Sequence, residues 1–222
     1  MAQSRQLTEL FVLSHQYIGR DWAADSPMSA GCWLTVALLS DGTAKAYGRN
    51  HVGQKSIPHL KPGVRYTQVS AGRAHTLLLC SDGTVVACGR KRLGRRHRRC
   101  HRCSIPRLRG GLRYAQVSAG DAHSVLLLSD GTLAAYGRND QGQCEMQEAH
   151  VLWNEGFTQV SAGGFHTLAL QHGFPEIYAC GRNREGQCNI PRFEEELTYS
   201  QASTGSGCFL ISADCIGPPH EV

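Results

Sequence analysis

The sequence repeats itself, and this repetition limits the folds open to the chain more than any other feature does. A strand-like segment ending in Ser-Ala-Gly occurs at 66–72, 114–120 and 157–163. A shorter copy ends at Gly31, and a decayed copy lies at 199–205. Successive final glycines are 41, 48, 43 and 42 residues apart, and an insertion of about seven residues accounts for the longest interval. Repeats of this kind predict units that pack against their neighbours.

Each unit continues with turn signals between runs of β-forming residues. Ser-Asp-Gly-Thr separates two such runs at 81–84, and Asp-Gly recurs at 41–42 and 130–131. Because glycine supplies positive φ angles cheaply, we predict a hairpin with a two-residue primed turn at each place. A Gly-Arg-Asn turn follows, for example at 48–50, with Gly-Gln and often Ile-Pro after it. The pattern predicts three strands per unit and a short fourth strand around the Ile-Pro or the linker beyond it.

A period of 40 to 50 residues with about four strands in each unit is typical of a propeller blade. A β-sandwich is the alternative, but it would not repeat Val-Ser-Ala-Gly three times in register. We therefore predict an all-β fold, a β-propeller-like array of four complete blades plus a partial fifth, with about 42 residues per repeat. A closed ring and an open arc are both compatible with the sequence. The expected division is a degenerate segment 1–27 and a repeat domain 28–222, with units at about 28–63, 64–111, 112–154 and 155–196 and a partial unit at 197–217.

The combined motif resembles the repeat of the regulator of chromosome condensation family. Its parts are Ser-Ala-Gly-x-x-His-Thr, Ser-Asp-Gly-Thr and Gly-Arg-Asn-x-x-Gly-Gln, and the resemblance covers residues 28 to 212. It implies a β-propeller, commonly of seven blades, whereas this chain holds four recognisable units and a partial one. Members of that family include a nucleotide exchange factor for a small GTPase on chromatin, ubiquitin ligases with a separate catalytic domain, a plant ultraviolet photoreceptor and a bacterial β-lactamase inhibitor. The shared fold therefore does not determine the function.

Repetition also argues against catalysis. His75, His123 and His166 occupy the same place in three repeats, and Leu34 takes that place in the first. A reaction centre needs one copy of a group, whereas a repeated fold needs the same contact in every blade, so we interpret these histidines as structural. No Gly-x-Ser-x-Gly, phosphate-binding loop or His-Glu-x-x-His motif occurs. We expect no enzyme activity, no catalytic residue and no cofactor. By the same argument Asp41, Asp82 and Asp130 are turn residues.

One cysteine pair lies outside the repeat pattern. Cys100 and Cys103 form Cys-x-x-Cys, with His97 and His101 nearby. Zinc favours such ligands, but no second ligand pair follows at a set distance, and four ligands within seven residues would strain a tetrahedral site. The sequence favours an unliganded exposed loop with no metal, and a zinc site is the alternative.

Positive charge is concentrated in the second unit. Residues 90–113 contain eleven Lys and Arg and no acid, which leaves twelve basic against 18 acidic residues elsewhere in the chain. Such a run predicts either a site for phosphates, nucleic acid or an acidic protein patch, or a solvated insertion with no partner. The candidate binding residues are Arg95, Arg96, Arg98, Arg99 and Arg102.

These observations predict an intracellular protein, in the cytoplasm or nucleus, without membrane contact. No segment approaches the roughly 20 apolar residues of a membrane span, and the apolar run at 10–13 is too short for a signal peptide. The ten cysteines are then expected to be thiols in a reducing compartment.

We expect a non-enzymatic protein-interaction or scaffold module, because stacked blades present loops on rigid faces. Its partner would be a protein, such as a small GTPase or a ubiquitin-pathway protein, and the basic loop would also suit nucleic acid. Two alternatives remain. One is a guanine-nucleotide exchange regulator of a small GTPase at chromatin, and the other is a fragment of a repeat-bearing ubiquitin ligase.

Overall fold

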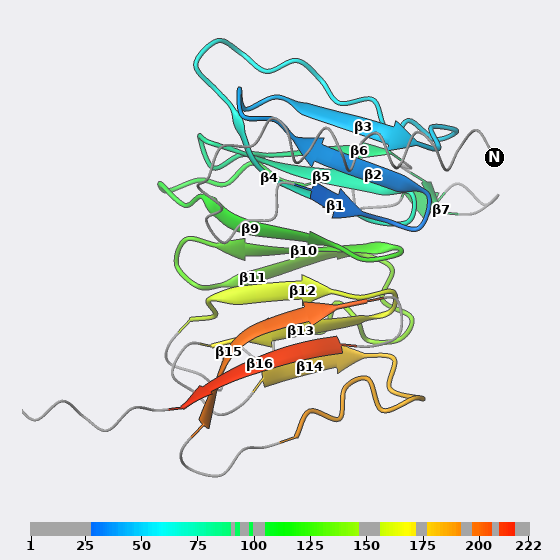
Figure 1. Cartoon of the computed structure of the whole chain (residues 1–222), viewed down its shortest axis with the longest axis vertical. Coiled ribbons are helices and arrows are strands. Elements are labelled where there is room, and N and C mark those ends of the chain that lie inside the picture. Colours follow the sequence, from blue (N-terminus) through cyan, green and yellow to red (C-terminus); the bar gives the residue numbers. More distant parts are fainter. Residues whose placement is uncertain are drawn as a thin grey trace, which may run out of the picture.

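The computed structural model describes an all-β molecule. It describes residues 28–89, 92–93, 98–99, 105–146, 156–171, 177–191, 197–205 and 209–215. Within these ranges the chain forms antiparallel sheets that stack in sequence order, with β2 and β3 at one end and β14 and β16 at the other (Figure 1). This confirms the predicted all-β, propeller-like array of repeats. The described residues contain no helix with the length and apolar character that a bilayer crossing requires.

Each full repeat forms one three-stranded sheet, and we number the five sheets of the array blades 1 to 5. The first strand of each blade is the inner strand, followed by a middle and an outer strand. Blade 1 contains β1 (Met28–Ala30), β2 (Leu34–Leu38) and β3 (Ala44–Gly48), and blade 2 contains β4 (Tyr66–Ala71), β5 (His75–Cys80) and β6 (Val85–Gly89). Blade 3 contains β9 (Tyr114–Ala119), β10 (His123–Leu128) and β11 (Leu133–Gly137), and blade 4 contains β12 (Gln159–Ala162), β13 (His166–Leu170) and β14 (Ile177–Gly181). Blade 5 pairs β15 (Leu197–Thr204) with β16 (Phe209–Cys215), and a separate small hairpin joins β7 (Arg92–Leu93) to β8 (Arg98–Arg99).

The hairpins form where Asp-Gly predicts them, but the turn type is different from the one expected. At Asp82-Gly83 the Cys80 N–H binds the Thr84 carbonyl and the Gly83 N–H binds the Cys80 carbonyl, at 2.8 and 2.9 Å. This closes a three-residue loop with Gly83 at φ 76°, so the predicted two-residue primed turn is wrong. Asp82 Oδ1 accepts from both the amide and the hydroxyl of Thr84, at 2.9 and 2.6 Å, which confirms its role as a turn residue.

The Ile-Pro segments do not form the short fourth strand that we expected. Ile57–Pro58 has no strand structure, and proline lacks the N–H that a ladder requires. The segment is held instead by the next blade, whose Tyr66 hydroxyl donates to the Pro58 carbonyl at 2.9 Å. Ile57 packs against the apolar cluster between blades 1 and 2. The same arrangement recurs at Ile105–Pro106 with Tyr114 and at Ile190–Pro191 with Tyr199.

The apolar core lies between successive blades. Successive residues of a strand point to opposite faces of the sheet, so each middle strand contributes to two interfaces. Leu78 packs toward blade 1 with Val36, whereas Leu77 packs toward blade 3 with Leu126. All six residues of β5 are buried, as are all six of β10. Every internal blade is therefore covered on both faces, as expected for stacked repeats.

Candidate binding channel and rim

A glutamine and a serine of the inner strand bind the backbone of the following blade. Gln68 Oε1 accepts from the Val117 N–H at 2.8 Å, and Ser70 Oγ accepts from the Ala119 N–H at 3.0 Å. Sequence reasoning treated these residues only as part of a strand, although their recurrence at one position was the signal that marked them. The same bonds join Gln116 to Val160, Ser118 to Ala162, Gln159 to Ala202 and Ser161 to Thr204, and Ser29 binds Ala71.

The repeated histidines are buried at blade interfaces. His123 Nε2 lies 2.9 Å from Thr167 Oγ1 of blade 4, and His75 Nε2 lies 2.9 Å from Ser124 Oγ of blade 3. Thr167 Oγ1 donates to the Gln143 carbonyl at 2.8 Å, so it accepts from His123, whose Nε2 therefore carries the proton. Burial, and to a smaller extent the neighbouring His166, lower the pKa of His123 to about 4. A neutral, fully buried ring fits the structural interpretation of these residues.

The Gly-Arg-Asn-x-x-Gly-Gln motif also has a structural explanation. Asn139 Oδ1 accepts from the Cys144 N–H at 2.8 Å, and Gln143 Oε1 accepts from the Gln141 N–H at 2.9 Å. The side chains of the motif thus fold its own loop, while the Gln143 carbonyl receives Thr167 of the next blade. These residues are accounted for without a ligand.

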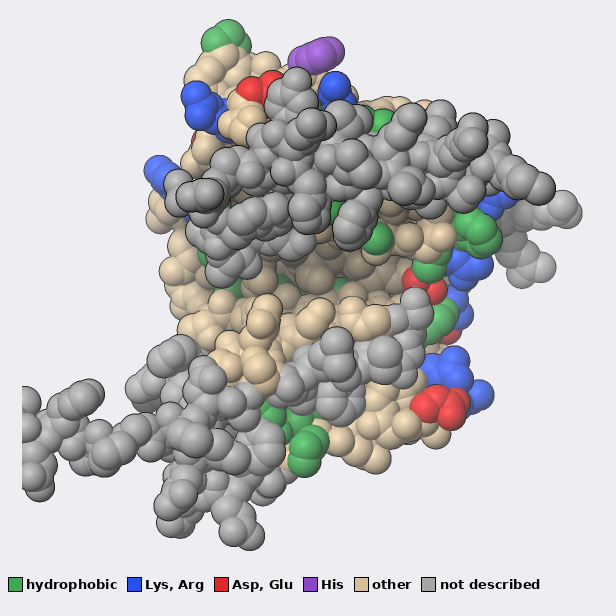
Figure 2. Space-filling view, viewed as in Figure 1, with side chains coloured by type: hydrophobic (Ala, Val, Ile, Leu, Met, Phe, Trp, Pro, Cys, Tyr) green, Lys and Arg blue, Asp and Glu red, His purple; other side chains and the backbone are tan. Residues whose placement is uncertain are grey.

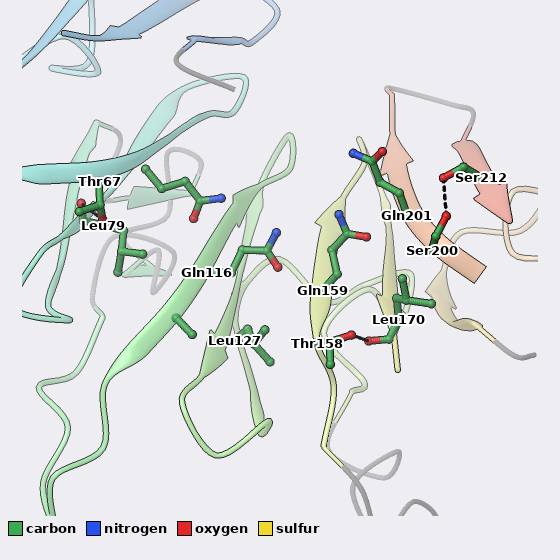
Figure 3. A pocket seen from close by; sticks show the side chains of 12 residues that line it. Thr67, Leu79, Gln116, Leu127, Thr158, Gln159, Leu170, Ser200, Gln201 and Ser212 are labelled. Carbon is green, nitrogen blue, oxygen red and sulfur yellow. Dashed lines mark hydrogen bonds between the residues drawn. The ribbon is translucent and has the colours of Figure 1, made fainter. Parts of the chain in front are cut away.

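The inner strands surround a polar channel. Its wider end holds a cavity of about 680 Å³, and two smaller cavities of about 200 and 220 Å³ continue along the strands. Gln116, Gln159 and Gln201 extend into the same space at the wider end (Figure 3). The amide oxygens of Gln116 and Gln159 bind the next blade, so their NH₂ groups are the donors that remain for a ligand. The described lining residues of this end are neutral amides, hydroxyls and aliphatic side chains, which suit polar binding rather than proton transfer.

The strand ends opposite the Asp-Gly turns form a rim that carries arginine and aromatic side chains. The Arg49 guanidinium lies over the Trp33 ring, 5.4 Å from its centroid, and Arg138 lies over Phe165 at 5.5 Å. Trp33 is 55% exposed, which is unusual for so large an apolar side chain. Charged side chains gather along the right-hand edge of the molecule in Figure 2.

Carboxylates fix several of the rim arginines. Arg138 binds Asp140 through two hydrogen bonds of 2.5 and 2.6 Å, which raise the pKa of the guanidinium and lower that of the carboxyl group. Arg73 lies 4.0 Å from Asp121 at the mouth of the channel, and Cys32 Sγ donates to Asp121 at 3.6 Å. Burial and then the Asp121 charge raise the pKa of Cys32, so this thiol is not activated as a nucleophile.

The predicted binding role of the basic insertion is not tested by the structure and stays a prediction. Arg98 and Arg99 form β8 of the small hairpin, and the other three candidate arginines, Arg95, Arg96 and Arg102, lie outside the described residues. The zinc alternative also falls outside them, since His97, Cys100, His101 and Cys103 are all undescribed. Among the described residues, no three His, Cys, Asp or Glu side chains are placed to hold a metal ion.

Blades stacked around a channel define a protein of the β-propeller type. Residues 66–94 and 114–143 match the model of the regulator of chromosome condensation (RCC1) repeat. The chain therefore carries RCC1 repeats, and the resemblance inferred from its motifs is confirmed. No curated protein matches the sequence.

Solved structures show the same fold. Prp20p from Saccharomyces cerevisiae has a TM-score of 0.66 at 19% identity, over 83% of this chain and 54% of Prp20p. Human WBSCR16 has a TM-score of 0.63 at 16% identity, over 84% of this chain and 58% of that protein. The ectodomain of the Physcomitrella patens receptor kinase CR4 has a TM-score of 0.59 at 16% identity, over 86% of this chain and 49% of the ectodomain. At these identities the likeness concerns the fold, and the chain spans only about half the length of these structures.

Proposed function

We propose that this chain is a non-enzymatic protein-interaction module whose rim binds a protein partner. The observation that carries the proposal is the exposed Trp33 with Arg49 stacked on its ring. Tryptophan and arginine dominate the binding energy of protein interfaces. A loop on a stacked scaffold holds them in place before binding, which reduces the entropy that binding costs.

The chemistry of the rim favours a partner with an acidic patch around an apolar contact. Arg49 stacks on an aromatic ring, a geometry that leaves the edge of a guanidinium open to carboxylates. Arg73 lies at the channel mouth with 57% of its side chain exposed, but Asp121 at 4.0 Å offsets its charge, so Arg49 is the main positive group of this surface. Such a surface steers an acidic partner and fixes its orientation.

The non-enzymatic part of the proposal rests on what the polar groups already do. The buried histidines His75 and His123 hydrogen-bond to the next blade, and burial lowers the pKa of His123 and His166. An intracellular location, in the cytoplasm or nucleus, is part of the proposal. It accords with the free thiols of Cys80 and Cys88, which persist in a reducing compartment.

Affinity capture with rim variants tests this function. The purified chain is compared with Trp33→Ser/Arg49→Ser in capture from a cell extract, followed by quantitative mass spectrometry. Lys61→Ser/Leu112→Ser is the matched control, because it removes one charge and one exposed apolar side chain near the opposite strand ends. We expect the rim variant to lose at least one protein that the control retains. Identical sets of captured proteins for all three forms would contradict the proposal.

A guanine-nucleotide exchange regulator is the second candidate. It is favoured by the structural likeness to Prp20p, whose structure was described with its binding to Gsp1p and histones. The test is the release of a fluorescent guanine nucleotide from Gsp1p, with Prp20p as the positive control. Faster nucleotide release in the presence of this chain would favour the exchange function. A rate equal to the spontaneous rate would contradict it and favour the interaction module.

A further inference from the structure

Three successive blades hold a glutamine amide in one fixed orientation at the wider end of the channel. Gln68, Gln116 and Gln159 each accept a backbone N–H of the following blade through Oε1, at 2.8, 2.7 and 2.8 Å. Because a backbone N–H can only donate, the other end of each amide is its NH₂ group, which carries two donors. Among the described residues, none accepts a hydrogen bond from these three NH₂ groups. The blades therefore offer a row of oriented donors to the channel.

Threonine hydroxyls beside these amides act as acceptors. Thr67 Oγ1 donates to the Leu79 carbonyl at 3.3 Å, and Thr158 Oγ1 donates to the Leu170 carbonyl at 3.2 Å (Figure 3). Each hydroxyl proton is already used, so the oxygen faces a ligand as an acceptor. Both threonines are exposed, line the wider end and directly precede one of the glutamines. Fixed donors and fixed acceptors therefore line one cavity.

This cavity lacks charge as far as its described lining goes, because none of those side chains is ionisable. Its volume of about 680 Å³ lies within the range of small-molecule sites, about 300–1,000 Å³. An anion would find no positive charge there and could not donate to the threonine oxygens. A cation would face NH₂ donors without a carboxylate to pair with. The lining therefore favours a neutral ligand whose own groups both donate and accept, as hydroxyl groups do.

The arrangement of the lining also restricts the shape of the ligand. The donors come from successive blades placed around the cavity, so a complementary ligand must direct polar groups outward in several directions. A six-membered ring that carries hydroxyl groups has this form. A peptide main chain also donates and accepts, but an extended peptide presents these groups along its two edges only.

We propose that the wider end of the channel binds an uncharged cyclic polyol, of the monosaccharide or cyclitol class. Its hydroxyl groups accept from the NH₂ groups of Gln116 and Gln159 and donate to Oγ1 of Thr158. This site goes beyond the protein-binding rim, since the two lie at opposite ends of the inner strands. Thr67 lines the wider end, whereas Cys32, next to the rim residue Trp33, lines the other end.

A variant that changes the donors but keeps the interblade bond tests the proposal. Gln116→Glu/Gln159→Glu retains an oxygen for the N–H groups of the next blade and replaces both NH₂ groups by carboxylate oxygens. Isothermal titration calorimetry and saturation-transfer NMR with glucose, galactose, mannose and myo-inositol provide the measurement. We expect the unchanged chain to bind at least one of these compounds. Loss of the donors should weaken that binding at least about tenfold.

A second variant removes an acceptor without disturbing the strand. Thr158→Val leaves the Leu170 carbonyl bound to the Thr158 backbone N–H at 2.8 Å, so the melting temperature should stay close to that of the unchanged chain. Polyol binding should become weaker, because a methyl group replaces the hydroxyl oxygen. If Gln116→Glu/Gln159→Glu lowers the melting temperature, Thr158→Val replaces it as the deciding variant.

Two control variants should bind the polyol as the unchanged chain does. Gln141→Glu adds a negative charge on a loop of blade 3, and Trp33→Ser/Arg49→Ser removes the rim that we propose for a protein partner. A chain that binds none of the tested polyols would overturn the proposal, as would binding that both channel variants retain in full. Binding of an uncharged Gly-Ser peptide blocked at both ends, in place of the polyols, would also overturn it.

Discussion

The Nε2 atom of His123 lies 2.9 Å from Oγ1 of Thr167, and the two residues belong to neighbouring blades. The threonine hydroxyl donates onward to the carbonyl of Gln143 at 2.8 Å. A buried chain of hydrogen bonds therefore ties the middle strand of blade 3 to the middle strand of blade 4, and ties that strand in turn to the loop after β11 of blade 3. Because each link in such a chain is shielded from water, removing one member leaves the others unsatisfied.

Replacing His123 by leucine should lower stability, whereas the same change at His166 should not. His123→Leu leaves the Thr167 hydroxyl without its donor and should cost about 1–3 kcal/mol. Both ring nitrogens of His166 are buried without a hydrogen-bond partner among the described residues, and Leu34 fills this position in blade 1. Denaturant unfolding of both variants measures the difference. A larger loss at His166 than at His123 would contradict the role of the interblade bond.

Stability should fall when the pH is lowered from about 6.5 to 4. Burial lowers the pKa of His123 to about 4, from an ordinary 6.5, so in this window the unfolded chain binds a proton that the folded chain excludes. The free energy of unfolding should drop by up to about 3 kcal/mol, and the lowered pKa of His166 acts in the same direction. Urea unfolding at several pH values measures the slope, which His123→Leu should reduce. An unchanged slope in that variant would assign the effect to other groups.

Gly120→Ala should be far more damaging than Gly110→Ala. A Cβ at Gly120 would overlap both the His123 ring and the carbonyl of Gly163 in the next blade, so the blades would have to separate. We expect a loss of about 3 kcal/mol or more. Gly110 has φ +70° but faces open space, so alanine there costs only about 1 kcal/mol of backbone strain. Thermal melts compare the two, and equal losses would mean that backbone strain outweighs blade packing.

Gln116→Leu should lower the free energy of unfolding more than Gln201→Leu does. Gln116 Oε1 accepts from the Val160 N–H at 2.7 Å, and leucine would leave that amide unsatisfied at a cost of about 1–3 kcal/mol. Gln201 is exposed in blade 5, so its replacement should leave the monomer within about 0.5 kcal/mol of the original. Urea unfolding of the two variants and of the unchanged chain measures the difference. A comparable loss at Gln201 would indicate that blade 5 already has a neighbour in the monomer.

Changing Arg95, Arg96, Arg98, Arg99 and Arg102 to glutamine tests the basic insertion. If the insertion binds duplex DNA, the contacts should be mainly to phosphates, with affinity that falls steeply as salt rises and depends little on base sequence. Titration of both forms with duplex DNA at low and moderate salt provides the measurement, with circular dichroism as the folding control. Equal binding by the two proteins, or none by either, would identify the insertion as a solvated loop.

The local elements could be predicted from the sequence because their signals are local. Asp82-Gly83 predicts a hairpin wherever it stands between β-forming runs, and the recurring glycines set the length of each unit. The turn type was predicted wrongly, because the extra residue that closes the loop depends on hydrogen bonds between Cys80 and Thr84. The fourth strand was also wrong, because Pro58 is held by a tyrosine of the next blade.

The sequence by itself determined the repeat, the all-β composition of each blade and the equivalent positions of the histidines, since all three follow from one pattern in every unit. Only the tertiary structure decided what the repeated side chains touch. Gln68 and Val117 are 49 positions apart and meet because two blades stack, and Arg49 lies over Trp33 because two loops end at the same rim. The exposure of Gln201 and Ala30 also depends on which blade stands beside them. A repeated sequence specifies the same residue in each blade, but burial belongs to pairs of blades, and the end blades have only one neighbour in the described array.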